Sequence, residues 1–72
     1  MTIAERVQDV LELVIEGSAA PERKMDDLGL DSLDFAQLLV DLDEEFDIHV
    51  PEQDAALCET VGELIALVEG KC

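Results

Sequence analysis

Aromatic residues are nearly absent from this sequence, which has two Phe and neither Trp nor Tyr. Its core must therefore be built from Leu, Val and Ile. Gly and Pro are also few, with four and two residues, and alternating strand-like patterns are scarce. These features favour an all-α fold, a small four-helix bundle with three main helices and one short helix.

Long apolar runs and targeting signals are missing too. No stretch is apolar over the roughly 20 residues that a membrane-spanning helix needs, and no basic region followed by an apolar segment opens the chain. The two cysteines, Cys58 and Cys72, lack the close spacing of metal ligands. We therefore expect a cytoplasmic protein with reduced thiols and no metal site.

Positive charge is scarce. Four Lys and Arg stand against nineteen Asp and Glu, which gives a formal net charge of −15. Such a field repels nucleic acid and anionic membranes, and it steers partners with basic patches into place. The apolar residues are nevertheless numerous and periodic, which argues against disorder. We expect a folded, self-repelling monomer whose partners are proteins with basic surfaces.

Helical periodicity and helix-start signals predict one domain, residues 1–72. Thr2 with Glu5, and Thr60 with Glu63, have the spacing of a capping box. The predicted helices span about residues 2–16, 32–47, 53–58 and 60–69.

The predicted helix ends and the long connection rest on a few residues. Gly17 is expected to end the first helix in a left-handed conformation, and Gly70 to end the last. Between the first two helices, residues 18–30 are predicted to form a loop. Met25 and Leu28 are its expected anchors in the core.

The helix over residues 32–47 is predicted to bury one apolar stripe. Acidic residues from Asp41 to Asp47 crowd its far end, where they oppose the helix dipole. This arrangement has no evident folding benefit and suggests that the acidity serves an external partner, although a solvated face is the simpler alternative. The expected stripe consists of Leu33, Ala36, Leu38, Leu39, Leu42 and Phe46.

The stretch from Asp27 to Asp34 contains a serine at the predicted helix start. Serine catalysis needs a nearby base, and the only histidine, His49, lies past the other end of the helix, roughly 24 Å away at the usual rise. The Gly-x-Ser-x-Gly pattern of hydrolases is also absent. Ser32 is therefore not expected to act in catalysis, and Asp31 or Ser32 could simply cap the helix.

The whole run Asp27-Leu28-Gly29-Leu30-Asp31-Ser32-Leu33-Asp34 resembles the attachment motif of the acyl carrier protein family. The resemblance implies that Ser32, within Asp31-Ser32-Leu33, carries a covalent 4'-phosphopantetheine arm, and that Asp31 serves recognition by a phosphopantetheinyl transferase. The likeness extends over nearly the whole chain. Further matches are Glu5-Arg6-Val7, Leu42 through Phe46, Ile48, Val50-Pro51 and Thr60-Val61. The resemblance also places Cys58 where the family has an aliphatic core residue, which implies a small buried apolar residue and not a reactive thiol.

The resemblance also implies a docking surface for partner enzymes on the second helix. Expected partners are the transferase, a ketosynthase, an acyltransferase and other synthase enzymes with basic patches. Gln37 and Asp41 depart from the family pattern, in which an acidic and a small residue are common. The positions carried over are Asp34, Gln37, Val40, Asp41 and Glu44.

Members of the family shelter an acyl chain among their helices, which implies a cavity in the aliphatic core. Phe35, close to the serine, is expected to shield the arm or contact partners. For each proposed lining residue, ordinary core packing is an equal alternative. These residues are Leu33, Ala36, Leu42, Ile48, Leu57 and Ile65.

Taken together, these features and the resemblance predict a non-catalytic carrier of acyl intermediates for fatty-acid or polyketide-type synthesis. Two alternatives stay open: an aminoacyl or peptidyl carrier, and an acidic helical adaptor in which Ser32 is only a cap.

Overall fold

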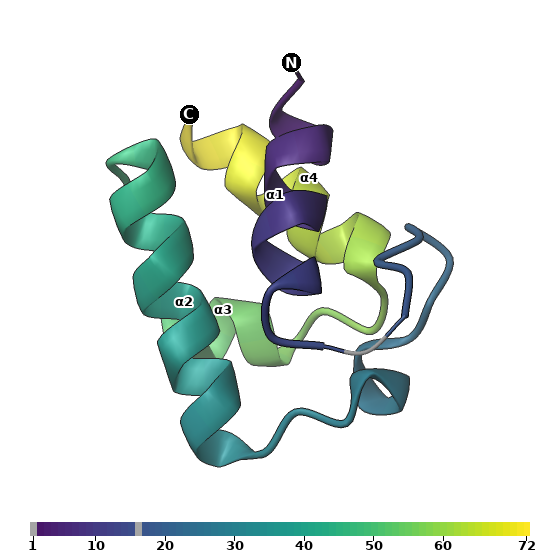
Figure 1. Cartoon of the computed structure of the whole chain (residues 1–72). Helices are drawn as coiled ribbons and strands as arrows, with labels where there is room; N and C mark the ends of the chain where they lie inside the picture. Colours follow the sequence, from purple (N-terminus) through teal and green to yellow (C-terminus); the bar gives the residue numbers. More distant parts are fainter. Residues whose placement is uncertain (1, 16) are drawn as a thin grey trace.

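The computed structural model describes residues 2–15 and 17–72, and in that part of the chain all regular structure is helical (Figure 1). This confirms the predicted all-α class with three main helices and one short helix. A 3₁₀ turn, η1, also interrupts the long connection that was predicted to be a loop. The elements are α1 (Ile3–Glu12), η1 (Met25–Leu28), α2 (Ser32–Phe46), α3 (Glu52–Ala56) and α4 (Val61–Lys71).

The helices pack around an aliphatic core, as the shortage of aromatic residues predicts. α1 contacts both α4 and α2, and α3 contacts α4. The described part of the chain buries no charged or polar residue in this core. Its largest fully buried side chains are Leu11, Leu38, Leu42, Leu64, Val7, Val50, Val61 and Val68.

Both predicted capping residues are found at helix starts. The Thr60 hydroxyl accepts the Glu63 N–H at 3.2 Å, and the Glu63 carboxylate accepts the Thr60 N–H in return. The Thr2 hydroxyl accepts the Glu5 N–H at 3.1 Å, but it donates to the Glu5 carboxylate, so this box is not reciprocal. These bonds satisfy backbone donors that a helix start otherwise leaves unpaired.

Two predicted helix ends are wrong. α1 ends at Glu12, where the N–H groups of Leu13 and Val14 bond to carbonyls only three residues back and tighten the chain. Gly17 does have a positive φ of 85°, but it lies after the helix. Gly70 does not end α4, which continues to Lys71. Glu16, within the predicted first helix, lies outside the described residues.

The long connection is held against the start of α4 by backbone hydrogen bonds. The N–H of Val61 donates to the Arg23 carbonyl at 3.0 Å, and the N–H of Gly62 donates to the Pro21 carbonyl at 2.9 Å. A Cβ on Gly62 would lie 3.2 Å from that carbonyl oxygen, so the close approach favours glycine. Within the connection, Leu28 is buried and Met25 half-buried, which confirms both as anchors.

The acidic far end of α2 has a structural role that the sequence analysis missed. The Asp43 carboxylate accepts the N–H of Val50 at 2.8 Å and so fixes the chain as it leaves the helix. The Glu45 carboxylate pairs with Arg6 of α1 at 3.1 Å, and the Arg6 guanidinium lies 4.5 Å from the centre of the Phe46 ring. The inference that these charges bring no folding benefit is therefore wrong for Asp43 and Glu45.

We predict that Asp43→Ala destabilises the fold by about 1–3 kcal/mol, because the N–H of buried Val50 loses its acceptor. Asp43→Asn keeps an oxygen at the same position and is the matched control. Urea unfolding followed by circular dichroism measures both variants. Equal stability of Asp43→Ala and the unchanged protein would contradict the assigned role.

Candidate functional site

The start of α2 is built around the Asp31 carboxylate. Asp31 is the N-cap residue, in an extended conformation, and its side chain accepts the N–H of Asp34 at 2.8 Å. Its backbone carbonyl accepts the N–H of Phe35 at 2.9 Å. Of the two residues that were candidates for the cap, Asp31 therefore has this role, and Ser32 is the first residue of the helix.

Ser32 is exposed at this helix start. Gly29, at a φ of 73°, ends η1 in the left-handed region, and one residue, Leu30, then leads to the cap Asp31. Among residues 2–15 and 17–72, the Ser32 hydroxyl has no hydrogen-bond partner, and the N–H groups of Ser32 and Leu33 have no acceptor. An anion attached to this hydroxyl would meet free N–H groups and the positive end of the helix dipole.

The one histidine of the sequence is not placed to activate the serine. The imidazole of His49 is 80% exposed beyond the opposite end of α2, with Nδ1 3.5 Å from an Asp43 carboxylate oxygen. Within the described residues, no group of three or more His, Cys, Asp or Glu side chains could hold a metal ion. The site therefore offers an accessible hydroxyl, not an activated nucleophile.

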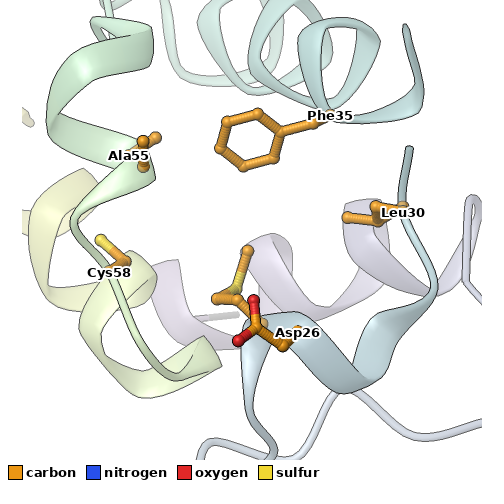
Figure 2. Close-up of a pocket in the computed structure, with 7 residues that line it drawn as sticks. Asp26, Leu30, Phe35, Ala55 and Cys58 are labelled. Carbon is orange, nitrogen blue, oxygen red and sulfur yellow. The ribbon is translucent and has the colours of Figure 1, made fainter. Parts of the chain in front are cut away.

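A cavity of about 240 Å³ opens next to the start of α2, between η1 and α3 (Figure 2). The Phe35 ring reaches into it from α2, and Ala55 and Cys58 lie on the opposite side, in and after α3. Phe35 follows Ser32 by three residues and so lies one helical turn away. The lining residues are Met25, Asp26, Leu30, Phe35, Ala55, Ala56 and Cys58.

None of the six residues predicted to line the acyl cavity lines the cavity between η1 and α3. Leu33 and Leu57 are 81% and 80% exposed, and Ala36 is also exposed. Leu42 and Ile65 are buried in the filled core, and the half-buried Ile48 packs against it. Leu33 and Ala36 are consequently not part of the buried stripe of α2. The open space lies at the edge of the core, next to η1, and not in its centre.

Cys58 differs from the prediction in its burial. It is only half-buried and lines the cavity, with its Sγ 3.7 Å from the Asp54 carbonyl oxygen. Desolvation, followed by the charges of Glu63 and Asp54, raises the pKa of the Cys58 thiol. The thiol is therefore largely protonated at neutral pH and a weak nucleophile.

The five predicted docking residues share α2, but they are not equally free. Asp34, Gln37 and Glu44 are exposed, and Val40 is 47% exposed. Asp41 is half-buried and accepts a hydrogen bond from the Gln37 amide at 3.0 Å. The sequence analysis missed two exposed leucines near these positions, Leu33 in the first turn and Leu13 at the end of α1. Leu33 was predicted to belong to the buried stripe of the helix, and no role was predicted for Leu13.

Comparison with known proteins agrees with a carrier. The family model described as "Phosphopantetheine attachment site" matches residues 2–68. A protein of Exiguobacterium sp. named "Acyl carrier protein" is 39% identical over 70 residues, covering 96% of this chain and 82% of its own. Proteins of the same name from Clostridium acetobutylicum and Solidesulfovibrio magneticus are 38% and 33% identical, covering 93% and 99% of this chain and 92% and 96% of their own.

The fold and these matches define a protein of the phosphopantetheine-dependent carrier class. More particularly, the chain belongs to the acyl carrier protein family. It carries acyl groups as thioesters on a phosphopantetheine arm. None of the helices among the described residues is long and apolar enough to cross a membrane.

We predict that iodoacetamide alkylates Cys58 severalfold more slowly in the folded protein than in urea, at mildly alkaline pH. The raised pKa leaves less thiolate in the folded state, so the difference should narrow as the pH rises above the folded pKa. Peptide mass mapping locates and times the modification, and Cys72 in the same sample is the control for reagent activity. A rate for Cys58 that does not change on unfolding would contradict the raised pKa.

Proposed function

We propose that Ser32 carries the 4'-phosphopantetheine arm, joined through its Oγ by a phosphodiester. The observation that supports this most strongly is the division of roles at the start of α2. Asp31 caps the helix through the N–H of Asp34, so the neighbouring serine hydroxyl is exposed and is not needed to hold the helix. When bound, the arm supplies a flexible thiol on which an acyl group is held as a thioester.

The helix start suits an attached phosphate. The N–H groups of Ser32 and Leu33 in the first turn lack acceptors within the described chain, and the helix dipole places partial positive charge there. Because the one histidine of the sequence lies beyond the opposite end of α2 from Ser32, we infer that the chain performs no catalytic step itself. Transfer of the arm to Ser32 belongs to a phosphopantetheinyl transferase.

We infer that the cavity lined by Phe35 shelters part of the tethered acyl group. It lies one helical turn from Ser32 and has apolar walls from Met25, Leu30 and Ala55. Its volume of about 240 Å³ is somewhat below the roughly 300–1,000 Å³ typical of small-molecule pockets. A short acyl group, or one end of a longer chain, is the cargo that this space accommodates without rearrangement.

We further propose that Asp34, Gln37, Val40, Asp41 and Glu44 form the docking face for the transferase, a ketosynthase, an acyltransferase and related synthase enzymes. A basic patch on such an enzyme would be attracted by the carboxylates, and the exposed part of Val40 would add an apolar contact. Leu33, beside the serine and 81% exposed, extends the apolar part of the surface toward the arm.

Incubation of the full chain with coenzyme A and a broad-specificity phosphopantetheinyl transferase should add one phosphopantetheine mass, measured on the intact protein. Ser32→Ala should abolish the adduct, because the acceptor oxygen is gone. Ser18→Ala removes the other serine of the chain and should load normally. An adduct that persists in Ser32→Ala, or no adduct on the unchanged protein, would refute the assignment.

Reversal of one charge on the docking face should weaken loading by the same transferase. We expect Glu44→Lys to raise KM about fivefold to tenfold at low salt, and the effect to shrink as salt screens the charges. Glu69→Lys, at an exposed position on α4, carries the same charge change on a different helix, outside the proposed docking face, and should have a smaller effect. Equal KM values for the two variants would show that only net charge matters.

A further inference from the structure

Leu13 is a large apolar residue in an unusual position. It directly follows α1 and is 83% exposed. Its N–H bonds to the Val10 carbonyl at 3.2 Å, so its backbone belongs to the ordered turn that ends the helix. A single exposed leucine is common on protein surfaces and indicates little by itself. Here, however, the side chain borders a groove.

The groove lies between the end of α1 and the C-terminal half of α2 and has a volume of about 330 Å³. Leu13 and the nearly buried Val10 form its α1 side, and Asp41, Glu44 and Glu45 form its α2 side. One wall is therefore aliphatic and the other carries three carboxylates. No Lys or Arg is among the described residues that line it.

The three carboxylates differ in how they are engaged. Glu45 pairs with Arg6, and Asp41 accepts the Gln37 amide. The Glu44 carboxylate is exposed and has no hydrogen bond or ion pair within residues 2–15 and 17–72. Like charges on one wall repel each other, and a cation from outside would relieve that repulsion. The groove thus combines an apolar contact surface with a carboxylate, that of Glu44, for which the described chain provides no positively charged partner.

This combination selects one kind of occupant. A second copy of the chain would bring a further −15 of net charge and be repelled. A basic helix that projects one aliphatic side chain satisfies both walls, since the side chain would contact Leu13 while flanking Arg or Lys face the carboxylates. Asp41 and Glu44 are also members of the proposed docking face on α2, so the groove is continuous with it.

We propose that the docking surface of this carrier crosses the groove from α2 to Leu13, and that it receives a basic partner helix whose central aliphatic side chain packs against Leu13. The proposal rests on the proposed docking face and deepens it by naming the chemistry of the partner and a contact on α1. Leu13 provides the apolar contact, and Glu44 provides the charge that draws the partner in.

The test uses two synthetic amphipathic helical peptides with identical flanking arginines, one with a central Leu and one with a central Ala. Binding to the full chain is measured by backbone amide NMR titration. Leu13→Gln should weaken binding of the Leu peptide about fivefold to tenfold and change binding of the Ala peptide little, because only the Leu–Leu13 contact is lost. Leu57→Gln, which alters an equally exposed leucine after α3, should leave both affinities unchanged.

The proposal is overturned if Leu13→Gln weakens both peptides equally, if it weakens neither, or if Leu57→Gln has the same effect as Leu13→Gln. Retained helical content and melting temperature in both variants, measured by circular dichroism, show that the exposed substitutions leave the fold intact.

The Ser32 mass assay is independent of the peptides. An adduct on Ser32 together with unselective peptide binding refutes the groove alone, whereas absence of the adduct refutes the attachment site.

Discussion

The hydrogen bond from the Asp34 N–H to the Asp31 carboxylate supports the start of α2, and the accessibility of the neighbouring serine depends on it. If Ser32 were the capping residue, its hydroxyl would be occupied by a backbone N–H. Asp31 takes that role one position earlier, so Ser32 lies inside the first turn with its hydroxyl exposed. The helix cap and the exposed hydroxyl at the helix start are thereby provided by two different residues, Asp31 and Ser32.

The large negative charge of the chain is divided between internal and external uses. Asp43 holds the exit from α2, Glu45 joins α2 to α1 through Arg6, and Glu63 caps α4. Glu44, between the first two in sequence, has no partner in the described chain and faces solvent. The acidic run at the end of α2 is therefore not a uniform surface. Asp43 and Glu45 stabilise the fold, and Glu44 between them is the residue that we propose takes part in recognition.

Local signals in the sequence were sufficient for the helix starts, the all-α class and most of the buried stripes, since capping residues and helical spacing act over a few positions. Burial at the start of α2 was not predictable in this way. Because α1 ends at Glu12, it does not extend over the first turn of α2 (Figure 1), and Leu33 stays exposed. A cavity was predicted, but not its lining, and the Arg6–Glu45 pair was not predicted at all, because both join residues far apart in the chain.

The backbone bond between the Met25 N–H and the Glu59 carbonyl, at 2.9 Å, limits how the cavity next to the start of α2 can widen. Met25 lines the cavity from η1, and Glu59 directly follows Cys58 on the α3 side. This hydrogen bond therefore joins the η1 wall and the α3 wall along one edge of the cavity. Widening that edge would break a main-chain hydrogen bond, whereas the α2 wall can yield by rotation of the Phe35 side chain. One edge of the cavity is thus fixed by the main chain, and its most adaptable wall is the Phe35 ring, one helical turn from Ser32.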